Sequence, residues 1–211
     1  MKYTLIVGTK EWSSWSLRPY LALRHVGVPF DEVVVRLRAT ETSPEILRYS
    51  PAGRVPVLRI GERAIWDSLA ICETLNDLHP DAKLWPDDLL VRAEARALAA
   101  EMHSGFPDLR DQLSMAFVRR LKLPPLRDAT KAQIARVVDA WETALAHHDG
   151  RYLFGRFSIA DCMYAPVVSR FTTYGVEVPP RSRAYMETIR ALPAMQDWHK
   201  AAREEVDSGL A

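Results

Sequence analysis

The sequence has little cysteine: Cys72 and Cys162 are its only two in 211 residues. They form neither a CxxC pair nor the ligand spacing of a zinc site. A disulfide scaffold and a cysteine-based metal centre are therefore not expected, and we expect no metal. Two buried thiols in a reducing compartment fit this pattern.

An excess of charge is also missing, because 28 Lys and Arg are balanced by 27 Asp and Glu. Nucleic-acid binders usually carry a basic excess or stripe, so we expect no nucleic-acid partner. No stretch approaches the roughly 20 apolar residues of a membrane helix. The apolar run after Lys2 is too short for the core of a signal peptide. These absences predict a cytoplasmic protein without membrane contact.

Hydrophobic residues make up 48% of the chain, which is enough to bury a core. Residues 3–7 and 31–37 are short apolar runs typical of strands. The helical pattern of residues 17–26 lies between them and predicts a parallel strand–helix–strand unit. Proline is tolerated in the first turn of a helix, so Pro19 predicts that this helix begins close to Ser16 or Leu17.

The next segments complete a small sheet. Ser43 and Pro44 predict the start of a short helix through residue 48. Residues 55–60 and 63–66 flank a Gly-Glu pair, which is a hairpin signal, and residues 68–78 are apolar at helical spacing. We therefore expect an α/β domain, a mixed four-stranded sheet with helices on both faces.

The remainder of the chain predicts an all-α bundle. Residues 84–88 interrupt the pattern, and no convincing strand follows. Ser158 and Asp161 have the spacing of a capping-box variant that opens a helix. We expect domains at 1–80 and 89–211 joined by a linker at 81–88. The other expected helices span residues 89–102, 134–145, 183–191 and 193–206.

A serine-rich turn joins the first expected strand to the first helix: Trp12-Ser13-Ser14-Trp15-Ser16. A helix N-terminus presents unpaired N–H groups and a partial positive charge, which favour an anion. Serine hydroxyls there can donate to a thiolate and so raise the ionised fraction of a thiol. The alternative is that one serine is a plain helix N-cap.

Two further motifs point to a peptide-like ligand. A cis bond between Val55 and Pro56 would turn the Val55 backbone outward to pair with an extended peptide. Asp67 and Ser68 lie at a strand-to-helix junction, where Asp67 would pair with an ammonium group. The Ser68 hydroxyl and the helix amides would bind a carboxylate. Alternatively, these two residues are helix caps alone.

Together these motifs resemble the glutathione S-transferase superfamily. The run from Ser13 to Arg18 is most similar to the zeta class, whose motif is Ser-Ser-Cys-Ser-x-Arg, with Trp15 in place of the cysteine. Val55-Pro56 and Asp67-Ser68 look like the thioredoxin-like half, and Ser158-Ile159-Ala160-Asp161 matches a buried capping box of the helical half. The resemblance covers nearly the whole chain. It implies an N-terminal thioredoxin-like domain that binds glutathione, a helical C-terminal domain, and a homodimer.

The resemblance also implies roles for individual residues. Ser13 matches the catalytic position, and Ser14 beside it is an alternative that the sequence does not separate from it. Some related proteins have a cysteine at this position. A serine here favours a mechanism that stabilises the thiolate of glutathione over one that forms a mixed disulfide. Arg38 and Arg54 are candidates for the glycine carboxylate of glutathione. The implied glutathione-binding residues are Trp15, Arg54, Val55, Pro56, Asp67 and Ser68.

An acceptor pocket is expected between the domains, above the sulfur of glutathione. Methionine and aromatic side chains form adaptable apolar walls, although each could equally be interdomain core. His103 is either a general base or structural. The candidates are Met102, His103, Phe106, Met115 and Phe117.

These observations predict a glutathione transferase that conjugates glutathione to a small hydrophobic electrophile in detoxification. One alternative is a zeta-like, glutathione-dependent cis–trans isomerase, although the zeta glutamine is not evident near residues 105–107. Another alternative is a glutathione-binding module without catalysis, because a fold does not determine a function.

Overall fold

The first apolar run forms an inner strand of a four-stranded sheet. The structure, a computed structural model, describes residues 1–211. The strands are β1 (Tyr3–Gly8), β2 (Phe30–Val35), β3 (Val57–Ile60) and β4 (Arg63–Ile65), in the order β2-β1-β3-β4. β1 pairs parallel with β2 and antiparallel with β3, and β3 pairs antiparallel with β4. The expected mixed sheet is confirmed.

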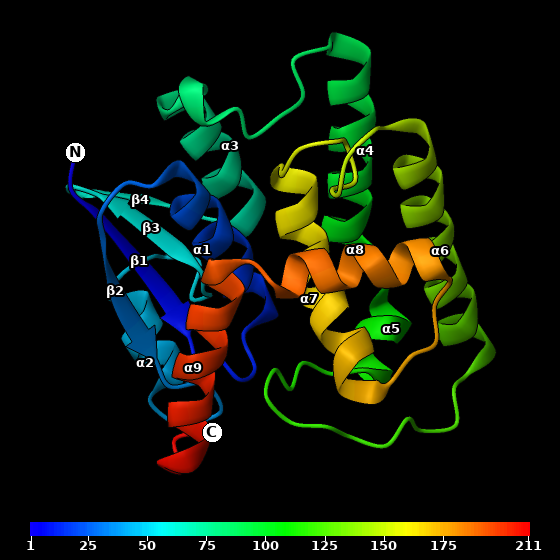
Figure 1. Ribbon diagram of the computed structural model, residues 1–211. Helices are drawn as coiled ribbons and strands as arrows, with labels where there is room; N and C mark the ends of the chain where they lie inside the picture. Colours follow the sequence, from blue (N-terminus) through cyan, green and yellow to red (C-terminus); the bar gives the residue numbers. More distant parts are fainter.

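Side chains of β1 alternate between the two faces of this sheet. Leu5 and Val7 join the main core, which includes residues of α1 (Ser14–Val26) and α3 (Ser68–Leu78). Ile6 points the other way into a small cluster with Ile46 of α2 (Thr42–Leu47). The sheet is thus covered on both faces (Figure 1).

Two helix starts differ from the expectation. α1 begins at Ser14, so Pro19 is its sixth residue rather than a first-turn residue. Pro19 has no N–H for the carbonyl four residues earlier. α1 is packed along its length against α3 and α7, and this tertiary packing outweighs the lost bond. α2 begins at Thr42 with Glu41 as its N-cap, so the expected cap at Ser43 was two residues late. The Thr42 hydroxyl accepts from Ala39 N at 3.0 Å.

The second half is helical, as expected, with two short isolated bridges between residues 152 and 156. Two short elements, η1 and α5, were not predicted, because three to six residues are too few to show periodicity. The elements are η1 (Pro80–Ala82), α4 (Leu89–Ser104), α5 (Pro107–Gln112), α6 (Asp128–His147), α7 (Ile159–Tyr174), α8 (Pro180–Arg190) and α9 (Pro193–Asp207). The domain boundaries at 1–80 and 89–211 stay a prediction.

α7 is the centre of the molecule. All of its residues except Thr172 are buried, and it packs against α1, α4 and α8. Its expected start is confirmed: the Asp161 carboxylate accepts from Ser158 N at 2.8 Å within a complete capping box. α9 returns to the N-terminal half, where Trp198 Nε1 donates to the Lys10 carbonyl at 3.1 Å (Figure 1). None of the helices has the length and apolarity that crossing a bilayer requires.

Candidate active site

The serine turn places two buried hydroxyls at the start of α1. Ser13 is the residue before the helix, but its side chain makes no capping hydrogen bond. Its Oγ donates instead to Ser16 Oγ at 2.7 Å, and Ser16 Oγ accepts from Gly8 N at 3.1 Å. Ser13 therefore occupies the N-cap position without capping the helix through its side chain, and Ser16 connects it to the end of β1.

Ser14 has a different environment. Its Oγ accepts from Arg170 Nη2 at 3.3 Å, across the interface between α1 and α7. Because the oxygen accepts from a cation, its own proton is left available to donate to another group. Ser13 and Ser14 are each 4% exposed, so neither hydroxyl lies on the open surface.

Three arginines gather at the start of α1, two of them over the Trp15 ring and one on Ser14, and we call Arg18, Arg110 and Arg170 the cationic cluster. The guanidinium carbons of Arg18 and Arg110 lie 4.2 and 4.9 Å from the centre of the Trp15 ring. Arg18 is fully buried, and its Nη1 donates to Ser68 Oγ at 3.4 Å. Burial, then the charge of Arg110, lowers the pKa of Arg18 to about 9. Arg18 therefore remains a cation at neutral pH.

Asp67 performs two tasks at the start of α3. Its Oδ1 caps the helix by accepting from Leu69 N at 3.0 Å and Ala70 N at 3.3 Å. Its Oδ2 lies 3.0 Å from His103 Nε2, which links the sheet half to α4. The His103 ring stands edge-on to Trp15 with centroids 5.3 Å apart. Asp67 is thus a helix cap through one carboxylate oxygen, and its second oxygen is directed toward His103.

One cavity of about 870 Å³ brings these segments together, and we call it the Trp15 cavity. The Val55–Pro56 bond beside it is cis, as is the Trp66–Asp67 bond. Arg54 lines the Trp15 cavity. The guanidinium carbon of Arg38 instead lies 4.3 Å from the centre of the Trp12 ring. The lining residues are Trp15, Leu37, Thr42, Ser43, Ile46, Ala52, Gly53, Arg54, Val55, Pro56, Trp66, Asp67, Ser68 and His103.

Comparison with known proteins identifies the family. A model of the glutathione S-transferase N-terminal domain matches residues 12–78, and a model of the C-terminal domain matches residues 124–201. Maleylacetoacetate isomerase of Rattus norvegicus is 31% identical over 203 residues, which cover 93% of this chain and 92% of that protein. The chain belongs to the glutathione S-transferase superfamily.

Other members of the superfamily support this placement. A zeta-class glutathione S-transferase of Euphorbia esula is 29% identical and covers 88% of this chain and 85% of its own length. A crystal structure of a glutathione transferase homologue from Burkholderia, with bound glutathione, has a TM-score of 0.74 and 26% identity. That match covers 97% of this chain and 99% of the other. The resemblance to the zeta class and the expected fold are therefore confirmed.

The expected glutathione-binding residues of this superfamily member converge, but the expected acceptor residues do not. All six expected glutathione-binding residues line the Trp15 cavity. Of the expected acceptor residues, His103 alone lines it. Met102, Phe106 and Met115 lie in the main core. Phe117 lines a separate hollow near His199, with ring centroids 6.1 Å apart. The structure thus places Phe117 away from the Trp15 cavity.

The cationic cluster was missed by the sequence reasoning. Arg110 and Arg170 lie far from the serine motif in sequence, and Arg170 is in the middle of a nearly all-buried helix. An arginine within an apolar run was the available signal, because a buried charge needs nearby partners. The structure contains no group of three or more His, Cys, Asp or Glu residues that could hold a metal ion.

Proposed function

We propose that this chain binds glutathione in the Trp15 cavity and uses its thiolate to attack a small electrophile. The observation that carries the proposal is the pair Ser13 and Ser14 at the start of α1, beside Arg170 of the cationic cluster. Neither serine lines the cavity itself, but both directly precede Trp15, which does. The hydroxyls, the helix N-terminus and the guanidinium groups all favour an anion. A thiolate is the anion that glutathione would bring to this position.

The lining of the Trp15 cavity supports a binding mode for the rest of the tripeptide. Asp67 Oδ2 would pair with the ammonium of the γ-glutamyl group. The N-terminus of α3, which begins at Ser68, would bind the carboxylate of that group. The Val55 backbone would pair with the cysteinyl residue, and Arg54 with the glycine carboxylate. A volume of about 870 Å³ is in the usual range for a ligand of this size.

The two serines have different roles in this mechanism. Ser14 accepts from Arg170 and can donate a hydrogen bond to sulfur, whereas Ser13 donates to Ser16 and must rotate to reach a thiolate. A free thiol has a pKa of about 8.5, and each unit of lowering raises the thiolate fraction roughly tenfold at neutral pH. Either hydroxyl would therefore contribute through the pKa of bound glutathione rather than through its affinity.

The test combines calorimetry with an ultraviolet titration of bound thiolate. Wild type should bind glutathione, and Ser13→Ala or Ser14→Ala should raise the apparent pKa of the bound thiol while affinity stays nearly unchanged. Ser104→Ala, an exposed serine of α4, is the matched control and should change neither quantity. Absence of glutathione binding by wild type would overturn the proposal. An unchanged thiol pKa in both variants would remove the serines from the mechanism.

A second candidate is a glutathione-dependent cis–trans isomerisation of a substrate that carries carboxylates. Relatives are named maleylacetoacetate isomerase in rat and maleylpyruvate isomerase in Ralstonia. The cationic cluster beside Trp15 favours an anionic acceptor over a neutral one. In this reaction the thiolate adds to a conjugated double bond, the new single bond rotates, and elimination restores both the double bond and glutathione.

Turnover separates the two candidates. Conjugation consumes glutathione and a chromogenic aryl halide, whereas isomerisation converts a cis dicarboxylic enone and leaves the glutathione concentration unchanged. Retention on immobilised glutathione without either reaction would favour a binding module instead. We also propose a cytoplasmic location. We further propose a homodimer, and size-exclusion chromatography with light scattering would test this oligomeric state.

A further inference from the structure

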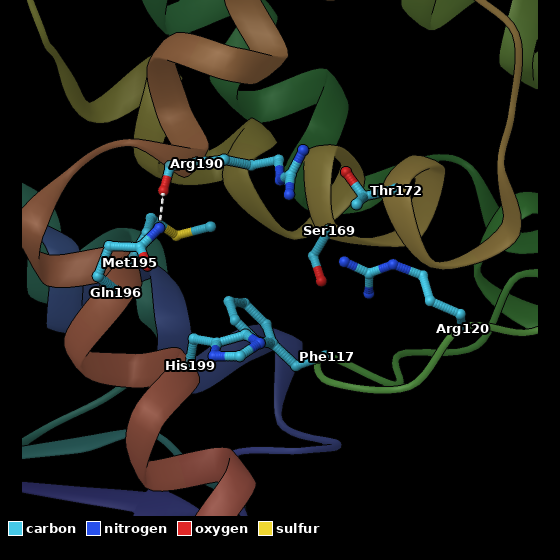
Figure 2. A pocket seen from close by; sticks show the side chains of 8 residues that line it. All are labelled: Phe117, Arg120, Ser169, Thr172, Arg190, Met195, Gln196 and His199. Carbon is cyan, nitrogen blue, oxygen red and sulfur yellow. Dashed lines mark hydrogen bonds between the residues drawn. The ribbon is translucent and has the colours of Figure 1, made fainter.

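A second, smaller hollow lies between the C-terminal helices, and we call it the Ser169 pocket. It has a volume of about 260 Å³ and shares no residue with the Trp15 cavity. Its walls come from α7, α8, α9 and the segment between α5 and α6 (Figure 2). The lining residues are Phe117, Arg120, Ser169, Thr172, Arg190, Met195, Gln196 and His199.

Ser169 forms the buried floor of this pocket. The residue is 4% exposed, and its Oγ has no hydrogen-bond partner in the structure. Figure 2 shows the hydroxyl directed toward the side of the pocket that Arg120, Phe117 and His199 line, with the Arg190 guanidinium on the other side of Ser169. A buried hydroxyl without a partner costs free energy, so this oxygen is one that a ligand could satisfy.

The walls of the pocket are cationic. Arg120 donates to backbone carbonyls alone, and the Arg190 guanidinium has neither a hydrogen bond nor an ion pair. No carboxylate is among the lining residues. Burial, then Arg203, Arg120 and Arg190, lowers the pKa of His199 below its usual 6.5. Arg120 and Arg190 thus line the pocket together with His199, and no lining carboxylate balances their charges.

We propose that the Ser169 pocket binds a small anion through a phosphate or carboxylate group. Arg120 and Arg190 would supply the charge and the forked donors that match such oxygens. Ser169 would donate a hydrogen bond from the floor, and Gln196, held by the bond from its Nε2 to the Arg190 carbonyl at 2.6 Å, would close one side. The small volume suits an oxyanion or a short acid rather than a drug-sized molecule.

The experiment uses inorganic phosphate and succinate as probes at constant ionic strength, with chloride as the reference anion. The imidazole resonance of His199 is assigned by loss of its signal in His199→Gln and followed by NMR. We expect saturable binding that raises the pKa of His199, because a bound anion stabilises the imidazolium. Tighter binding of phosphate or of succinate identifies which of the two groups the pocket prefers.

Three variants decide whether the pocket itself binds the anion. Arg190→Ala and Ser169→Ala should each weaken binding about fivefold or more. Arg183→Ala removes the same charge from an exposed position of α8 that does not line the pocket and should leave binding unchanged. Glutathione affinity should be the same in all three, which separates this test from that of the proposed function. Non-saturable shifts, or an equal loss in Arg183→Ala, would overturn the proposal.

Discussion

Arg170 Nη2 lies 3.3 Å from Ser14 Oγ and donates a hydrogen bond to it, joining the middle of α7 to the start of α1. The same guanidinium donates from Nη1 to the carbonyl oxygens of Leu113 and Arg110. Burial lowers the pKa of Arg170 to about 10, which leaves it charged at neutral pH. One buried cation thus orients a serine of the proposed site and also organises the end of α5.

Replacing Arg170 should therefore affect stability and chemistry together. Arg170→Met leaves two buried carbonyls without a donor and should lower the free energy of unfolding by about 2–4 kcal/mol. It should also raise the pKa of the bound glutathione thiol, because Ser14 loses its cationic partner. Urea unfolding and the thiolate titration measure the two effects. Arg183→Met, at an exposed position, should change neither, and a neutral outcome for Arg170→Met would contradict this account.

The two tasks of Asp67 can be separated by substitution. Asn caps helices about as well as Asp, so Asp67→Asn should retain the stability of α3 while removing the negative charge. Asp67→Ala should lose about 1 kcal/mol of stability as well. Both variants should weaken glutathione binding in calorimetry. Unchanged affinity in Asp67→Asn would show that the charge of Asp67 does not contact the ligand.

The capping box of α7 predicts a pH dependence of stability. Burial raises the pKa of the fully buried Asp161 from 3.8 to about 6. Between these values the folded state holds a proton that the unfolded chain has released. Asp161 therefore contributes a stability that is full below the unfolded pKa and is lost as the pH rises through the folded pKa.

Comparison with Asp161→Asn isolates this contribution, because the amide does not titrate. The free energy of unfolding of wild type, relative to that of the variant, should fall by about 3 kcal/mol as the pH rises across that interval. Above a pH of about 6 the difference in free energy of unfolding between wild type and variant should be constant. Urea unfolding at a series of pH values checks this, and a difference that does not vary with pH would show that Asp161 is ionised throughout.

The two cysteines should be inert in the folded protein. Cys72 and Cys162 are free and fully buried, and burial raises the pKa of Cys72 to about 12 and that of Cys162 well above its usual value. A thiol reagent acts on the thiolate, so native protein should release no chromophore from Ellman's reagent. Unfolding should expose both thiols. Rapid native reaction, or a mixed disulfide with glutathione, would contradict the serine-based mechanism.

Much of the N-terminal half could be predicted because its signals are local. The apolar run of β1, the Gly61 hairpin and the start of α3 at Ser68 each depend on a few neighbouring residues, and each is confirmed. The start of α1 was predicted wrongly. Local chemistry places Pro19 in a first turn, whereas packing against α3 and α7 extends the helix back to Ser14.

The sequence by itself determined the order of the strands and of the longer helices, and three of the segments that line the Trp15 cavity, because periodicity, caps and turn residues act over a few positions. Tertiary structure alone decided which distant charges meet. Arg18, Arg110 and Arg170 come from α1, α5 and α7, and they meet beside Ser14 and Trp15 only because these three helices come together in the fold. Tertiary structure also places Ser169 of α7 and Phe117 of the segment after α5 in one second pocket.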